Sequence, residues 1–376
     1  MEDEIRQRAA DRLEDPGPGR PPGRVLVGFD GFIDTIADAV SERISARPGD
    51  YVPVRTIADF GARIAASAGR STNIELRRRE VRGGGNGPLL GGALASLGVD
   101  VTLIGALGLP DDAASIDPAF EEIAALCARV VSIAPAARTD ALEFVDGKVM
   151  FNWPASLDAI NADTLAASVP RLPALCARVD VIATVNWTNT AALGSIWRLL
   201  REHAVPAEDP PMLFVDLSDP ARRCDDDLRG ALDELRHFPA VTLGLNTAEA
   251  ERLGALTGAA PASLDPGDRD ALAGAASGLR AATGLDAVAI HTHAAAAAAD
   301  RSGVADLWTR FTDRPAISTG AGDHFNGGLL AARLLGMPLD ECLACGCDAA
   351  TRFVRTGRRP SRGDLIAELR SPVRRI

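Results

Sequence analysis

Hydrophobic residues in this chain of 376 residues form short continuous runs that alternate with longer amphipathic segments. The runs have the length of β-strands and few interspersed polar residues, as expected for strands buried on both faces of a sheet. They span residues 24–29, 99–107, 179–185, 212–217, 240–245 and 286–292. The intervening segments have helical apolar spacing, and two begin at the capping residues Asn189 and Asp225. This alternation predicts a mostly parallel sheet covered by helices on both faces.

Two regions depart from this alternation. Residues 35–82 are irregular, whereas residues 131–155 contain "RTDALEFVDGKVMFNW", in which polar and apolar residues alternate with period two. Asp146-Gly147 lies where a hairpin would turn. We therefore expect a small β-sheet that is inserted between the first strand–helix units and projects from the main sheet. The alanine run at 294–299 follows a predicted strand and is interpreted as its continuation.

The ends of the chain and its cysteines bear on domain organisation and location. Residues 1–22 begin with acids and end in Pro and Gly, which predicts a polar extension on a semi-rigid linker rather than a secretory signal. Residues 23–376 are predicted to form one domain. No apolar run approaches the roughly 20 residues of a membrane span. Six scattered cysteines without disulfide spacing suit a reducing compartment. We expect a cytoplasmic protein that does not bind membranes.

Composition and charge exclude several functions. Hydrophobic residues make up 47% of the chain but aromatic residues only 4%, which favours close packing of helices on the sheet. The net charge of −11 and the lack of a basic block argue against a nucleic-acid partner. Lys148 is the only lysine among 40 Lys and Arg residues, so P-loop NTPases and protein kinases are excluded. Lys148 is expected to be an exposed residue of the hairpin turn.

The stretch "ISTGAGDHFNGG", residues 317–328, carries the candidate chemistry. Gly320, Ala321 and Gly322 leave their N–H groups uncovered at a predicted helix start, where the helix dipole also attracts anions. Asp323 follows directly and would repel a phosphate there, unless it accepts the proton of a hydroxyl that attacks that phosphate. The alternative is that Asp323 only caps a helix after a tight turn.

The segment "STGAGDHFNGGLLAARLLG" resembles the C-terminal signature of the pfkB or ribokinase-like carbohydrate kinases. The resemblance implies a three-layer α/β/α sandwich with a mostly parallel central sheet and a small β-sheet lid. It also implies phosphoryl transfer from ATP, with Mg²⁺, to a hydroxyl of a sugar or sugar-like small molecule. Asp323 is then the general base and Gly320 to Gly322 form the anion hole. The lid would comprise residues 35–82 and 131–155.

Further motifs extend the resemblance over residues 24–360. "GGGNGPLLGGALASLG" (83–98) is similar to the N-terminal signature, "LGLNTAEAERL" (243–253) to the Asn-x-x-Glu motif, and "VGFDGFID" (27–34) to a first strand that ends in a substrate-binding acid. The resemblance implies these roles: substrate binding by Asp34, Gly84, Gly85, Asn86 and Asn186; nucleotide or phosphate binding by Asn246, Glu249 and Thr319; and Mg²⁺ binding by Glu249, through water.

Two positions depart from the family pattern. Leu89 replaces a sugar-binding Asn, and Ile317 replaces an Asp that helps to form the monovalent-cation site of potassium-activated members. Two alternatives therefore stay open: a nucleoside or vitamin-alcohol kinase of the same fold, and a catalytically weakened sugar-binding or regulatory protein. An antiparallel lid with exposed edges would also allow a homodimer to form through the lid.

Overall fold

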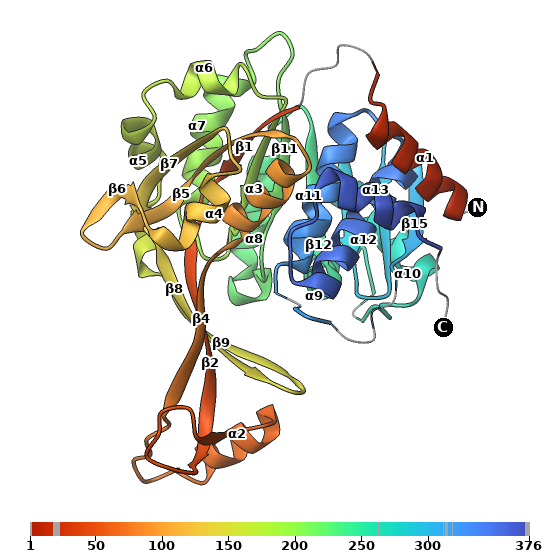
Figure 1. Ribbon diagram of the computed structural model, residues 1–376. Helices are drawn as coiled ribbons and strands as arrows, with labels where there is room; N and C mark the ends of the chain where they lie inside the picture. Colours follow the sequence, from red (N-terminus) through yellow and green to blue (C-terminus); the bar gives the residue numbers. More distant parts are fainter. Residues whose placement is uncertain are drawn as a thin grey trace.

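The computed structural model describes residues 2–17, 23–261, 263–310, 312, 315–317 and 319–372. Among these residues, ten strands form one large sheet, and helices cover both of its faces (Figure 1). Its strands are β1 (Arg24–Gly28), β5 (Asp100–Leu109), β6 (Asp112–Ile116), β7 (Arg129–Pro135), β10 (Val181–Val185), β11 (Met212–Asp216), β12 (Val241–Asn246), β13 (Ala287–His291), β14 (Ala295–Asp300) and β15 (Gly303–Trp308). Their order is β15-β14-β13-β12-β11-β10-β1-β5-β6, and β7 also pairs with β5.

The centre of this sheet is parallel, as the apolar runs predicted. β7, β5, β1, β10, β11, β12 and β13 all pair in parallel, and each of the six predicted runs forms one of these strands. The interpretation of 294–299 as a continuation of the preceding strand is wrong, because β14 runs antiparallel to β13. The Thr292 hydroxyl accepts hydrogen bonds from the N–H groups of Ala294 and Ala295, which turns the chain back on itself.

Two hydrophobic cores fill the space between the sheet and its two helical layers. In β1, Leu26 belongs to one core, whereas Val25 and Val27 belong to the other, as the period-two alternation of a strand requires. The first core packs against α5 (Ala162–Ser168), α6 (Leu172–Cys176), α7 (Leu193–Ala204), α8 (Asp225–Leu235), α9 (Thr247–Thr257) and α10 (Arg269–Thr283). The second packs against α1 (Glu2–Glu14), α3 (Asn86–Ser96), α4 (Glu121–Ala124), α11 (Ala321–Leu334), α12 (Leu339–Thr356) and α13 (Arg362–Arg370). The predicted three-layer sandwich is therefore present.

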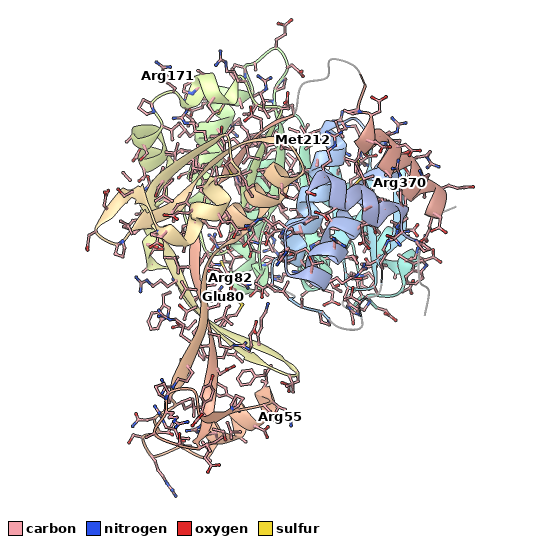
Figure 2. All side chains as sticks on the ribbon, viewed as in Figure 1. Arg55, Glu80, Arg82, Arg171, Met212 and Arg370 are labelled. Carbon is pink, nitrogen blue, oxygen red and sulfur yellow. The ribbon has the colours of Figure 1, made fainter. Side chains whose placement is uncertain are left out.

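A second sheet of five strands projects from the body (Figure 1). It consists of β2 (Phe32–Arg43), β3 (Tyr51–Pro53), β4 (Leu76–Gly84), β8 (Ala137–Phe144) and β9 (Gly147–Trp153), and α2 (Ile57–Ala65) lies at its far end. The hairpin predicted near Asp146-Gly147 is formed by β8 and β9. Figure 2 shows Glu80 and Arg82 on the narrow stalk that connects this sheet to the body.

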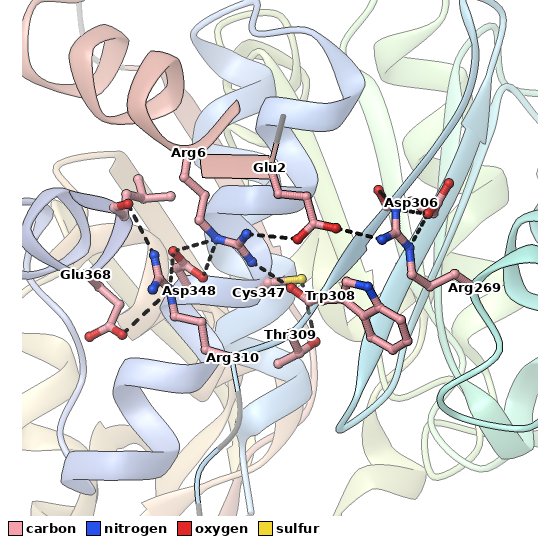
Figure 3. A network of polar contacts seen from close by, with 11 residues as sticks. Glu2, Arg6, Arg269, Asp306, Trp308, Thr309, Arg310, Cys347, Asp348 and Glu368 are labelled. Atoms are coloured by element: carbon pink, nitrogen blue, oxygen red, sulfur yellow. Dashed lines mark hydrogen bonds and ion pairs between the residues drawn. The ribbon is translucent and has the colours of Figure 1, made fainter. Parts of the chain in front are cut away.

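The N-terminal helix α1 is packed onto α12 and α13 through a buried network of charges (Figure 3). Arg6 is fully buried, lies 3.3 Å from the Asp348 carboxylate and donates a hydrogen bond of 2.6 Å to the Trp308 carbonyl. Arg310 donates a hydrogen bond to the same carboxylate at 3.1 Å. The first part of the predicted extension is therefore attached to the body, while residues 18–22 of the predicted linker lie outside the described residues. No described helix has the length and hydropathy needed to cross a bilayer.

The shared carboxylate makes Asp348 the critical residue of this network. We expect Asp348→Ala to lower the free energy of unfolding by about 3–5 kcal/mol, because two buried guanidinium groups lose their common counter-ion. Glu234→Ala is the matched control. It removes a carboxylate that pairs with partly exposed Arg198 and Arg201 and should cost less than about 1 kcal/mol. Denaturant titration measures both, and equal losses would contradict this account.

Candidate active site

The carboxyl ends of four neighbouring parallel strands bring the candidate residues together. Asp30 follows β1, Asn186 follows β10, and Asp216 and Asn246 are the last residues of β11 and β12. Because these strands are adjacent and parallel, the side chains meet at one edge of the sheet, where ligands bind in open α/β folds. The turn before α11 closes the site from the other side.

Asp30 is the buried acid at the end of the first strand, and the sequence interpretation missed it. The motif "VGFDGFID" contains two acids, of which Asp34 was selected as the acid that ends the first strand, but Asp34 lies within β2 of the second sheet. The Asp30 carboxylate accepts hydrogen bonds from the N–H groups of Asn86 (2.9 Å) and Gly87 (2.7 Å) and from the Asn186 amide (2.6 Å). Asp30 therefore fixes the start of α3 and orients Asn186.

Among the described residues, three that are not glycine have a positive φ, and all three line this site. Asn186, Ser218 and Asp219 have φ of 58°, 53° and 56° and lie in the loops after β10 and β11. L-residues adopt this conformation at an energetic cost that the surrounding structure must offset. In these loops the left-handed backbone turns the Asn186 side chain toward Asp30 and the Ser218 side chain toward Asn86.

The glycine-rich turn lies between two cavities. The smaller, of about 270 Å³, is lined by residues that include Asp34, Gly85, Asn86, Asn186, Ser218, Arg222, Thr319, Gly320 and Asp323. The larger, of about 650 Å³, is lined by residues that include Asn246, His291, Ala321, Gly322, Cys347 and Thr351. Most of the predicted site residues therefore line one cavity or the other. Gly84 and Glu249 do not: Gly84 lies directly against the Asp34 carboxylate, and Glu249 is buried beside Asn246.

The conformation of the turn depends on its glycines. Gly320 has φ of 90° and lies just before α11, whose first N–H groups have no partner within the helix. A Cβ on Gly322 would lie only 3.0 Å from the His291 ring, so a side chain here would crowd the larger cavity. Asp323, in the first turn of α11, is 7% exposed and accepts a hydrogen bond of 3.0 Å from the Asn86 amide. The turn thus offers backbone donors with a carboxylate beside them.

Asn246 and Glu249 form a capping box at the start of α9. The Glu249 carboxylate accepts the N–H groups of Asn246 (2.8 Å) and Asp219 (3.1 Å), while the Asn246 side chain accepts the N–H of Glu249. The motif therefore links the loop after β11 to the end of β12. Asp216 is held by the Ser218 N–H and by the Asn326 amide, each at 2.9 Å.

Burial and mutual repulsion make these carboxylates costly to ionise. Burial raises the pKa of Asp323 well above its ordinary value, and the Asp216 charge raises it further, while the Asn86 hydrogen bond opposes both. Burial also raises the pKa of Asp216, with a further contribution from the Glu249 charge. Burial lowers the pKa of His291 to about 4, so its ring is uncharged at neutral pH.

A cation would relieve the repulsion between Asp216 and Glu249. In the part of the chain that the structure describes, no group of three or more His, Cys, Asp or Glu side chains could hold a metal ion by itself. This arrangement fits Mg²⁺, which keeps several waters and shares its remaining ligands between carboxylates and substrate phosphates. Asp216 was not among the predicted site residues, although it ends a strand that the apolar pattern had identified.

A family profile and one relative of similar length indicate the same family. The profile of the prokaryotic ketohexokinase family matches residues 2–371. A ketohexokinase of Haloferax volcanii is 31% identical over 375 residues, which cover 97% of this chain and 96% of that protein. The match therefore includes the N-terminal helix, the second sheet and the C-terminal helices.

Solved structures of ribokinase-like enzymes share the fold. Arabidopsis thaliana ribokinase, complexed with ribose and ATP, superposes with a TM-score of 0.61 at 16% identity and covers 94% of this chain and 100% of its own. A carbohydrate kinase from Agrobacterium tumefaciens has a TM-score of 0.59 at 19% identity, with 92% and 97% covered. Adenosine kinase from Sinorhizobium meliloti has 0.61 at 16%, with 91% and 96% covered. The predicted ribokinase-like fold is confirmed.

The raised pKa of Asp34 predicts how pH affects the stability of the protein. Burial raises the pKa of Asp34 to about 6, although the Arg82 charge and the Thr139 hydroxyl oppose this shift. An unfolded Asp titrates near 3.9, so between about pH 4 and about pH 6 the folded state keeps a proton that the unfolded state has lost. The free energy of unfolding should therefore fall as the pH rises through this window.

Asp34→Asn should remove this loss. As the pH rises from about 4 to about 7, the free energy of unfolding of the variant should increase relative to that of the parent by up to roughly 3 kcal/mol. The reason is that the amide of the variant cannot ionise. Denaturant titrations at both pH values measure the difference. Asp226→Asn is the control, because the Asp226 side chain is 97% exposed. A pH dependence in Asp34→Asn identical to that of the parent would contradict the shifted pKa.

Proposed function

The chain belongs to the prokaryotic ketohexokinase family, and from this premise we propose that it transfers the terminal phosphate of ATP to a hydroxyl group of a ketohexose. Membership makes it a sugar phosphotransferase of the pfkB or ribokinase-like kind. The donor, the acceptor and the residue roles that follow are our proposals.

One observation carries this proposal: the turn from Gly320 to Asp323 contributes to both cavities. Ala321 and Gly322 line the larger cavity, whereas Gly320 and Asp323 line the smaller one. The larger cavity has the volume of a small-molecule site and would hold the nucleotide, while the smaller would hold the sugar. A phosphoryl group that passes between them must cross the turn, where free N–H groups stabilise its negative charge.

Asp323 would act as the general base. The hydroxyl oxygen of the sugar forms a bond to the γ-phosphorus as the bond from that phosphorus to the β,γ-bridging oxygen breaks, and ADP leaves with the electron pair. The hydroxyl proton passes to the Asp323 carboxylate. Burial raises the pKa of Asp323, and a carboxylate with a raised pKa is a stronger base toward the hydroxyl proton. Asn86 orients the carboxylate from the adjoining helix.

Polar side chains around the smaller cavity would bind the sugar hydroxyls. Asp34, Asn86 and Asn186 all line it and can accept or donate hydrogen bonds. Leu89 also lines it, so one position that carries an amide in most resembling kinases is apolar here. Gly84 leaves space for the Asp34 carboxylate, because a Cβ there would lie 2.2 Å from Asp34 Oδ2. These features define the cavity that would select the ketose.

Asn246, Glu249 and Thr319 would contact or organise the phosphates of the nucleotide. Glu249 and Asp216 provide carboxylates that would attract a hydrated Mg²⁺ ion, and Glu249 would contact this ion through water. When bound, Mg²⁺ neutralises phosphate charge. The His291 ring beside Gly322 is uncharged at neutral pH, so it adds no positive charge to the anion hole.

The second sheet would act as a lid over the smaller cavity. Met150 and Asn152 of β9 line that cavity together with residues of the body. β9 is also an edge strand with exposed Phe151 and Trp153, at 45% and 64%. An exposed apolar edge is a surface that pairing with a second copy would cover, so a homodimer through the lid is part of the proposal.

The experiment is to follow Mg²⁺-dependent release of ADP from ATP with a panel of ketohexoses, aldoses, polyols and nucleosides. We expect turnover with a ketohexose in the parent. Asp323→Asn should lower kcat by roughly 10²- to 10⁴-fold with little change in the KM for ATP, because the base is lost while the nucleotide cavity stays intact.

Asp226→Asn removes an exposed acid and should keep the parental rate. Parental activity in Asp323→Asn would refute the assignment of the base. Turnover that is restricted to nucleosides would refute the sugar acceptor. Binding of ATP without ADP release across the whole panel would favour a sugar-binding protein on a kinase fold.

A further inference from the structure

The only lysine of the chain lies against the glycine-rich turn. Lys148 was expected to be exposed at the hairpin, but it is half-buried and its Nζ donates a hydrogen bond to Thr319 Oγ1. The alternation along β9 explains the difference, because it places Lys148 on the same face as Met150 and Asn152, which line the smaller cavity. The second sheet thus brings an ammonium group to the residue that precedes Gly320.

The charges of Glu143 and Asp34 act on this ammonium group, but neither carboxylate forms an ion pair with it, nor does any other among the described residues. None of the ion pairs among the described residues includes Lys148, and its cross-strand neighbour Glu143 pairs with Arg79 instead. Burial lowers the pKa of Lys148, although the Glu143 charge opposes the shift. A partly buried positive charge without a counter-ion is costly in isolation, so it is well placed to accept an anion.

Two other basic residues near the turn are arranged differently. Arg222 lines the smaller cavity but donates to the Asn189 side chain at 3.1 Å. Arg82 lies on the stalk of the lid, where its charge acts on Asp34 (Figure 2). Lys148 alone among these three is bonded to the segment that leads into the anion hole.

From this arrangement, and resting on the proposed kinase function, we propose that Lys148 binds the phosphoryl group while it is transferred and so couples closure of the lid to catalysis. The ammonium group moves from Thr319 Oγ1 to an oxygen of the transferring phosphate. It donates hydrogen bonds and keeps its protons, while the hydroxyl proton of the sugar still passes to Asp323. Backbone N–H groups of the turn and the lid ammonium would then hold the phosphate from two sides.

A lysine suits this task better than an arginine. Its ammonium is a compact charge with three donors on a flexible stem, so it can exchange one oxygen acceptor for another without a fixed orientation. The nearby carboxylates of Asp34 and Asp323 oppose the approach of a phosphate. A cation delivered by the lid would offset that repulsion only when the lid is closed, which would also disfavour transfer to water in the open state.

The first test compares Lys148→Met, Lys148→Arg and Arg43→Met in the full chain. Lys148→Met should lower kcat by about 10²-fold, the usual effect of removing one donor to a developing charge, with a much smaller change in the KM for the sugar. Lys148→Arg should recover part of this loss, because it restores the charge. Arg43→Met should behave as the parent, since Arg43 is a 44% exposed lid cation paired with Glu75, which does not neighbour Lys148.

The outcomes separate this inference from the proposed function. An active parent combined with Lys148→Met at a kcat within about twofold of the parent would overturn the role of Lys148 and leave the kinase assignment intact. Equal losses in Lys148→Met and Lys148→Arg, with lowered denaturation midpoints in both, would assign Lys148 to lid stability instead. A parent that is inactive with every acceptor would overturn the proposed function.

A second test needs no turnover. Reductive methylation with ¹³C-formaldehyde keeps the charge and labels only Lys148 and the α-amino group, because the chain has no other lysine. The spectrum of labelled Lys148→Arg identifies the Lys148 signal by its absence. A non-hydrolysable ATP analogue, added with Mg²⁺ and fructose, should shift this signal, whereas ADP under the same conditions should not. Equal shifts with both nucleotides would overturn contact with the terminal phosphate.

Discussion

Five carboxylates are buried beside one another at the carboxyl edge of the parallel sheet, and the cost of keeping them there shapes the site. Asp30, Asp34, Asp216, Glu249 and Asp323 are each no more than 7% exposed. Burial raises the pKa of all five. Such groups stay in a folded protein only if donors or cations compensate the lost hydration. The local structure around them supplies these donors.

Backbone N–H groups and amide side chains provide most of the compensation. Asp30 and Glu249 each accept two backbone N–H groups, and Asn186, Asn326 and Asn86 donate to Asp30, Asp216 and Asp323. The left-handed loops after β10 and β11 are part of the cost of directing donors to this edge. What these hydrogen bonds leave uncompensated is negative charge, which explains why cations are central to the proposed reaction.

Two groups of positive charge serve different purposes in this molecule. The buried guanidinium groups of Arg6 and Arg310 share Asp348 and attach the N-terminal helix to the body. Those charges are fully paired and contribute to stability. The ammonium of Lys148 lies in the lid hairpin and forms no ion pair with the carboxylates that the structure describes. A paired charge fixes structure, whereas an unpaired charge beside an anion hole is available for a ligand.

The sequence by itself determined the parallel sheet and the glycine-rich turn, because burial on both faces produces apolar runs and an uncovered backbone requires glycine. It also located Asn86, Asn246 and Asp323 through local motifs. Only the tertiary structure selected Asp30 over Asp34 as the acid at the end of β1, since both are acids in one short motif. It alone brought Lys148 to Thr319, because that contact joins segments 171 residues apart and depends on how the second sheet folds over the body.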